Sequence, residues 1–191
     1  PQLVVVPPPI VDQRPPAVEE ELMRLLLLHA HDRISLPIEG EEPLQDAAGA
    51  IILDDLAADE MTFEFDPYAQ LHRAMQEAWQ QEERLLSGEF FSRHPEPAIA
   101  SVVAELLTER YALADWKRKN IFIQDRSEGL SKHVEECLLR FKELRLSGMI
   151  KHVTNQLENA QEESDRAALL QEFTSLQEVR NRLHKKLNRV L

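Results

Sequence analysis

In the last third of the chain the apolar residues recur at the spacing of an α-helix. They return every three or four positions from Val134 to Leu157 and, after the polar stretch 158–165, again from Leu169 to Val190. Residues 130–191 contain no proline and one glycine, Gly148. The pattern predicts two long amphipathic helices that pack as an antiparallel hairpin. A single continuous helix through the polar stretch stays open as an alternative.

Shorter amphipathic segments precede this region. They predict helices from Pro16 to about His29, over about 44–56, from Asp66 to near Gly88, and after His94. Asp66 reads as an N-cap because Pro67 follows it at the first helical position. A loop is expected between the first two helices, where the chain carries Pro37, Gly40 and Pro43. No long alternating strand is evident, so the fold class predicted is all-α: a helical bundle followed by a C-terminal antiparallel helical hairpin.

Three regions follow from this pattern. Residues 1–16 hold six of the eleven prolines and read as a proline-rich linker. Residues 17–128 form the bundle, and 129–191 form the hairpin. The first hairpin helix is apolar on more than one side up to Ile150, so its N-terminal half is expected to pack on the bundle. Gly148 then marks either a joint or close packing against another backbone.

The same division predicts how the parts behave alone. We expect residues 17–128 to fold without the hairpin, and the hairpin to be marginal by itself, because two helices bury little surface. The chain has no methionine before Met23, which suggests a fragment of a larger protein.

Charge is distributed unevenly between the two parts. The whole chain carries −12, but residues 1–127 hold 11 basic against 24 acidic residues while 128–191 hold 11 against 10. An acidic body opposes strong non-specific DNA binding. The last 12 residues carry five basic side chains and no acid. This basic end suits an acidic protein partner, or it offsets the negative end of the helix dipole.

Little in the sequence indicates catalysis or metal binding. Cys137 is the sole cysteine, which excludes an internal disulfide and a Cys-rich zinc site. His29 and His31 are two positions apart at a helix end and do not converge on one ligand. The acidic cluster Asp54, Asp55, Asp59 and Glu60 is interpreted as a solvated face. The two tryptophans, Trp79 and Trp116, are interpreted as core anchors. No glycine-rich phosphate loop, signal peptide or stretch of ~20 apolar residues occurs.

Arg180 is the sharper signal, because it interrupts the apolar seam of the last helix. It is either a snorkelling side chain, whose stem packs while its head reaches water, or an interface residue. The interface interpretation predicts a partner-binding surface around it made of Phe173, Leu176, Gln177, Arg180, Leu183, His184 and Leu187.

Five stretches between His94 and the C-terminus carry a likeness to a known family: 111–116, 120–121, 141–144, 149–150 and 169–180. With them, this part of the chain resembles the C-terminal helicase-binding domain of bacterial DnaG-type primases. The order of a proline-rich linker, an acidic helical bundle and a terminal hairpin is similar as well. Gln177 and Arg180 match a polar and a basic residue of that family's last helix.

The resemblance implies a non-enzymatic interaction domain. It would dock on the N-terminal domains of the hexameric DnaB-type replicative helicase in the bacterial cytoplasm, coupling RNA primer synthesis to the replication fork. The full-length protein would be a DNA primase, with zinc and magnesium in its upstream domains and no cofactor in this chain. We expect the chain to be monomeric alone, without contacts to nucleic acid or membrane. The alternative is a structural coiled-coil module that homodimerises through its C-terminal helices.

Overall fold

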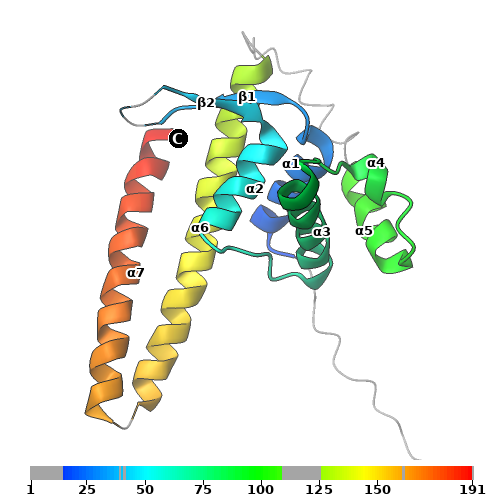
Figure 1. Cartoon of the computed structure of the whole chain (residues 1–191). Helices are drawn as coiled ribbons and strands as arrows, with labels where there is room; N and C mark the ends of the chain where they lie inside the picture. The colour runs from blue at the N-terminus through cyan, green and yellow to red at the C-terminus, as the bar shows by residue number, and fades with distance from the viewer. Residues whose placement is uncertain (1–14, 39, 41, 109–125, 161, 191) are drawn as a thin grey trace, which may run out of the picture.

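A computed structural model describes residues 15–38, 40, 42–108, 126–160 and 162–190. The mostly helical fold predicted from the sequence is confirmed, with one small sheet added. Figure 1 shows a bundle of shorter helices and two long helices side by side. In chain order the elements are α1 (Ala17–His29), β1 (Arg33–Leu36), β2 (Leu44–Ala47), α2 (Ala48–Ala58), α3 (Asp66–Glu82), α4 (Gly88–Phe91), α5 (Pro97–Thr108), α6 (Arg126–Asn159) and α7 (Glu163–Val190).

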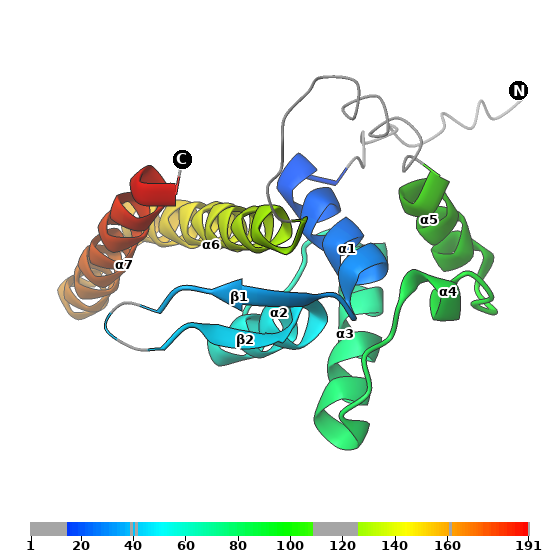
Figure 2. The ribbon, with the colours of Figure 1, turned by 90° about the horizontal axis from the view of Figure 1, so that it is seen from above.

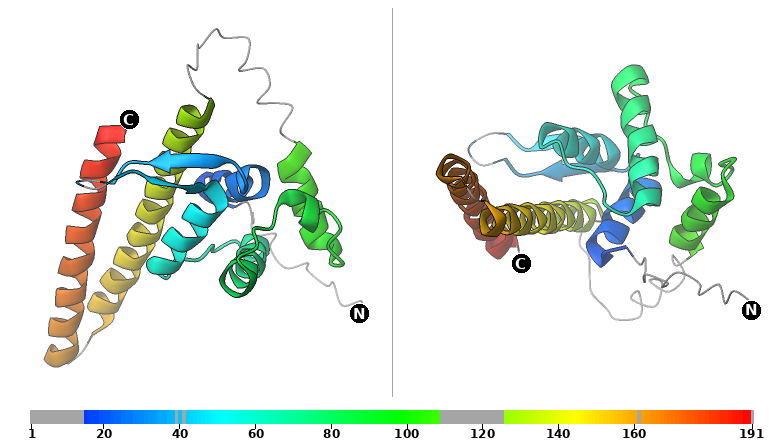
Figure 3. Two further views of the ribbon diagram at one scale, coloured as in Figure 1. Left: turned by 45° about the horizontal axis from the view of Figure 1, so that its top comes forward. Right: turned by 90° about the horizontal axis from the view of Figure 1, so that it is seen from below.

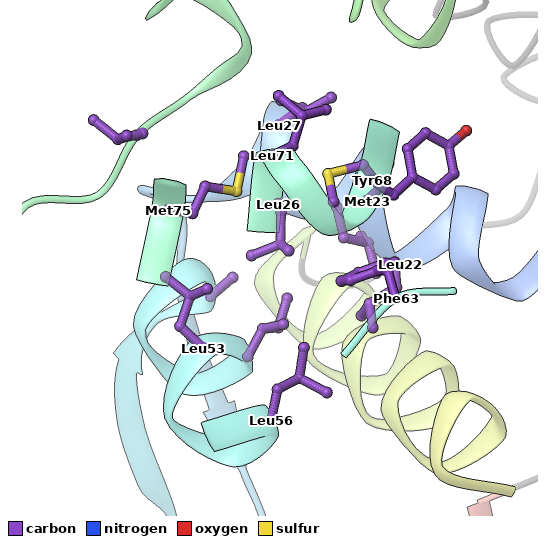
Figure 4. Close-up of a cluster of buried hydrophobic side chains, with 14 of the residues drawn as sticks. Leu22, Met23, Leu26, Leu27, Leu53, Leu56, Phe63, Tyr68, Leu71 and Met75 are labelled. Atoms are coloured by element: carbon purple, nitrogen blue, oxygen red, sulfur yellow. The ribbon is translucent and has the colours of Figure 1, made fainter. Parts of the chain in front are cut away.

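Helix α1 is the centre of the bundle and contacts α2, α3, α4, α5 and α6. Its leucines supply the apolar face that the sequence predicted, and Leu22 and Leu26 lie among side chains of α2 and α3 in Figure 4. Burying one such leucine contributes roughly 1.5–3 kcal/mol. Four residues of α6 join the same core: Val134, Cys137, Leu138 and Phe141.

The two-stranded sheet was not predicted, and the expected helix over 44–56 is wrong at its start. Residues 44–47 pair antiparallel with 33–36, and α2 begins only at Ala48. The Ala48 amide donates to the Asp32 carbonyl at 2.8 Å, which fixes the base of the β-hairpin. Strand β1 also packs on α6, where the Ser35 amide donates to Ser131 Oγ at 3.1 Å. Four-residue strands held by such distant contacts leave little period-two signal.

Both ends of α3 differ from the prediction. Phe65 occupies the N-cap position, and Asp66 lies inside the first turn, where its Oδ2 accepts a hydrogen bond from Gln70 Nε2 at 2.9 Å. The helix ends at Glu82 rather than near Gly88, because Glu83 adopts a left-handed conformation (φ 51°). Its amide donates back to the last turn, a common way to end a helix. The short helix α4 follows, in a stretch for which the sequence predicted no element.

Helices α6 and α7 dominate the outline of the molecule. In Figure 2, α7 lies at one end of the molecule and α4 and α5 at the other. Figure 1 and the left view of Figure 3 show the end of α6 and the start of α7 extending away from the bundle. Helix α6 passes through Gly148 without interruption, and a Cβ there would meet only Glu64 Oε1, at 3.8 Å. The interpretation of Gly148 as a site of close backbone packing is therefore wrong.

Some predicted features lie outside the described residues. They are residues 1–14 of the linker, Trp116, and the stretches 111–116 and 120–121 of the resemblance.

Candidate partner-binding surface

The two long helices meet along a seam of apolar side chains. On α6 the seam includes Leu146, Ile150 and Val153, which are buried although they lie outside the bundle core. On α7, Leu183 is buried in the seam. Apolar positions at alternating gaps of three and four explain this pairing, because they place one narrow stripe on each helix.

The residues predicted to bind a partner lie mostly on this seam rather than on the outer surface of α7. Leu183 is buried and His184 is exposed. The other five are partly buried: Phe173, Leu176, Gln177, Arg180 and Leu187. Their apolar members therefore pack within the molecule, and the polar side chains among them are the parts that can still reach a partner.

Arg180 has an unusual environment for a seam residue. Its side chain is partly buried, and its Nε is buried without a hydrogen-bond partner. Within the described part of the chain its guanidinium has no ion pair. A buried nitrogen with no partner is unfavourable, and guanidinium groups bind carboxylates and carbonyls readily. Only Nε of Arg180 is among the buried nitrogens without a partner, so its two Nη atoms are the part of the head that an acceptor from outside the chain could reach.

His184 lies one turn further along α7, and its Nε2 is 3.5 Å from Glu143 Oε1 on α6. The same carboxylate oxygen accepts a hydrogen bond from Ser147 Oγ at 3.1 Å. These contacts form a polar layer across the seam beside Arg180. Such layers fix the register of paired helices, because a shift of one turn would leave the polar groups unpaired.

The outer surface of α7 combines basic and apolar side chains. Arg182, Lys185 and Lys186 are exposed near its C-terminal end. Leu170 is 53% exposed and Val179 is 38% exposed. On α6, Met149 is 49% exposed. Mixed surfaces of this kind, with arginine and apolar residues together, are typical of protein interfaces.

A groove of about 490 Å³ separates α1 from the first half of α6. Its charged residues are paired: His133 Nε2 lies 2.8 Å from Glu21 Oε1, and Arg140 forms an ion pair with Glu136. The hydrogen bond raises the pKa of His133 and lowers that of Glu21. Burial raises the pKa of the Cys137 thiol at the floor to about 12. This protonated, buried thiol is a core residue rather than a nucleophile.

The acidic cluster at the end of α2 is used inside the molecule. Lys142 Nζ lies 2.7 Å from both Asp55 Oδ2 and Asp59 Oδ2, joining α6 to α2. Trp79 Nε1 donates to Asp54 Oδ1 at 2.7 Å. Burial opposes the charge on Lys142, but the hydrogen bonds from its ammonium to the two aspartates raise its pKa. Among the described residues, no three His, Cys, Asp or Glu side chains lie together so that they could hold a metal ion.

Sequence reasoning missed a buried ion cluster formed by Glu19, Arg145 and Glu64. Its signal was nevertheless present in the sequence. Glu19 lies three and four positions before Leu22 and Met23, on the buried face of α1, and Arg145 lies four positions after Phe141. Opposite charges on two buried helix faces indicate a pair, because an isolated charge there is costly.

Comparison with known proteins identifies a family but no activity. The model of a family described as a domain of unknown function (DUF8430) matches residues 11–190, and the chain belongs to that family. Neither the curated proteins nor the solved structures contain a match. Within the described residues, no helix is long and apolar enough to cross a membrane.

Proposed function

We propose that this chain is a protein-docking domain of a bacterial replicative primase. In this proposal it binds the N-terminal domains of the hexameric DnaB-type helicase through the C-terminal half of α7, around Arg180. The observation that carries the docking surface is Arg180, whose guanidinium has no ion pair among the described residues and whose Nη atoms, unlike Nε, are not buried. Lys185 and Lys186 are exposed further along α7 and give its C-terminal end a positive charge that suits an acidic partner.

The primase part of the proposal rests on the resemblance described above. The acidic bundle with a projecting hairpin fits that family's domain layout, and of the two matching residues, Gln177 and Arg180, Arg180 lies one turn before His184 of the polar layer. The domain acts at the replication fork in the cytoplasm as a monomer, without a cofactor of its own. Primer synthesis, with its zinc and magnesium, belongs to other parts of the full-length protein.

Homodimerisation through the C-terminal helices has less support. The apolar stripe of α7 that would pair between two copies is covered by α6 of the same chain. Light scattering on the purified chain tests this alternative, since a dimer has twice the mass of the monomer at every concentration above its Kd.

The docking surface is tested with Arg180→Met in titration calorimetry against the N-terminal domain of the cognate helicase. Methionine keeps an unbranched stem in the seam and removes only the guanidinium. Loss of a desolvated contact should cost about 2 kcal/mol of binding, roughly 30-fold in affinity, while the melting temperature changes little.

Arg182→Met is the matched control, since Arg182 is exposed and lies on the opposite side of α7. The affinity of this variant for the helicase domain should stay within a few-fold of that of the unaltered chain. Equal losses of affinity from Arg180→Met and Arg182→Met would mean that the overall positive charge of α7, and not a specific contact of Arg180, drives binding. No binding by the unaltered chain would refute the proposed function.

A further inference from the structure

The bundle and the hairpin share one helix, so something must fix the angle between them. The last α6 residue in the bundle core is Phe141, and the buried residues from Leu146 onward pack outside that core, along the seam with α7. Arg145 lies between these two environments. Its side chain is only 9% exposed, although it is charged.

Arg145 contacts two separate parts of the bundle. Its Nη2 forms an ion pair with Glu19 Oε1 on α1, and its Nη1 lies 2.6 Å from Glu64 Oε1, in the segment before α3. The guanidinium also lies over the ring of Phe141, 4.9 Å from its centroid. The contacts are ion pairs rather than aligned hydrogen bonds, since none of the three guanidinium nitrogens meets hydrogen-bond geometry.

Glu19 is the buried anion of the cluster, with no exposed surface. Its two carboxylate oxygens accept hydrogen bonds from the backbone amides of Glu64 and Phe65, at 3.0 and 3.1 Å. One carboxylate therefore joins α1, the segment between α2 and α3, and α6. Glu64 differs, because its side chain is 71% exposed and its charge stays hydrated.

Buried ion pairs of this kind add little net stability compared with apolar residues of the same size. They are sensitive to geometry, however, since displacing one partner leaves the other charge buried and unpaired. Apolar packing alone tolerates sliding of helices more easily. A cluster at the point where α6 leaves the bundle is thus placed to select one angle among several that packing would allow.

We propose that Glu19, Arg145 and Glu64 form a joint that fixes the direction of the α6–α7 hairpin relative to the bundle. Glu19 holds the bundle side of the joint, and Arg145 holds the hairpin side. This role does not depend on which partner binds the hairpin.

The test measures the direction of the hairpin in the full chain. Spin labels on cysteines at Gln80 in α3 and Ala167 in α7, both exposed, report the bundle-to-hairpin distance by pulsed electron paramagnetic resonance, with Cys137→Ala as the background. A second pair at Gln156 and Ala167 reports distances within the hairpin.

Arg145→Met should broaden or shift the bundle-to-hairpin distances and lower the melting temperature, because it leaves Glu19 buried with its backbone donors alone. Adding Glu19→Gln should recover much of the melting temperature, since no unpaired charge remains, while the distances stay broad. The distances within the hairpin should be unchanged in both variants.

Arg140→Met is the matched control on the same helix, because among the described residues the ion pair of Arg140 is with Glu136, one turn away on α6 itself, and does not join α6 to the bundle. It should leave both distance distributions as in the unaltered chain. If Arg145→Met does not fold, the double variant decides. A narrow bundle-to-hairpin distribution in the double variant, equal to that of the unaltered chain, would overturn the proposal.

Discussion

The two halves of α6 belong to different kinds of structure. In the first half, Val134 and Phe141 are completely buried in a core built by several helices. In the second half, Ile150 and Val153 are buried along the seam with α7, while the residue before each of them that faces outward, Met149 and His152, is exposed. One continuous helix thus passes from a three-dimensional core into a two-helix contact. Stability should be concentrated in the first half and accessible surface in the second.

Cutting the chain on either side of α6 tests this comparison most severely. A fragment of residues 15–128 loses Val134, Cys137, Leu138 and Phe141 from the core, so we now expect it to be molten rather than folded. This changes the expectation drawn from the sequence alone. A fragment of residues 15–160 keeps these residues and should melt cooperatively. Near-ultraviolet circular dichroism during heating distinguishes them, and equally sharp melting of both would contradict the comparison.

Two alanine substitutions compare the halves residue by residue. Phe141→Ala should lower the free energy of unfolding by about 3–5 kcal/mol, because the ring is fully buried and its removal leaves a cavity. Phe173→Ala, in the seam, should lower it by about 1–2 kcal/mol, because that ring is already partly exposed. Urea denaturation measures both values. Similar losses at the two positions would mean that the seam is packed as tightly as the core.

The interior of the bundle should also be sensitive to acid. Burial lowers the pKa of His72 to about 4 from an ordinary value near 6.5, so the unfolded chain binds its proton first as pH falls. Stability from this group is therefore present above pH 6.5 and is lost between pH 6.5 and 4, by up to about 3 kcal/mol. Chemical denaturation across this range should show a shallower decline for His72→Leu, and parallel curves for both proteins would exclude His72 as the cause.

The smallest effect is expected where α6 first meets α1. The hydrogen bond with Glu21 raises the pKa of His133, so this contact stabilises the folded chain below the ordinary histidine pKa and is lost as pH rises through the raised value. Both side chains are 40% exposed or more, and solvent screening limits the contribution to about 0.5 kcal/mol. His133→Gln should remove this decline on the alkaline side, as measured by melting temperature at low salt. The difference should shrink in high salt, and a difference insensitive to salt would point to packing instead.

Periodicity predicted the helix faces well because burial on one face follows directly from spacing. Leu22, Leu71, Ile99 and Val103 are buried as their positions indicate. The β-hairpin was missed because its strands are short, and distant contacts such as Ser35 to Ser131 hold them.

The candidate site was harder to predict than the fold. The spacing of Phe173, Leu176 and Leu183 shows that they share one face, but not whether that face meets α6 or another protein. The ion cluster was missed for a related reason. A charged residue on an apolar helix face is interpreted as a snorkelling residue when its partner is not known. Because Glu19 and Arg145 are far apart in the sequence, the sequence does not show that they are partners.

The joint at Arg145 makes the remainder of α6 a lever. From Arg145 to Asn159 the helix extends about 21 Å, at ~1.5 Å per residue. A rotation of about 10° at the joint would therefore displace the far end of α6 by roughly 4 Å, about the width of a side-chain contact. A change of a few tenths of an ångström in the distance between Arg145 and Glu19 is small at the joint. The rotation that goes with it displaces the far end of α6 by a larger distance. Any ligand or substitution that disturbs this contact would thus act at a distance on whatever the hairpin touches.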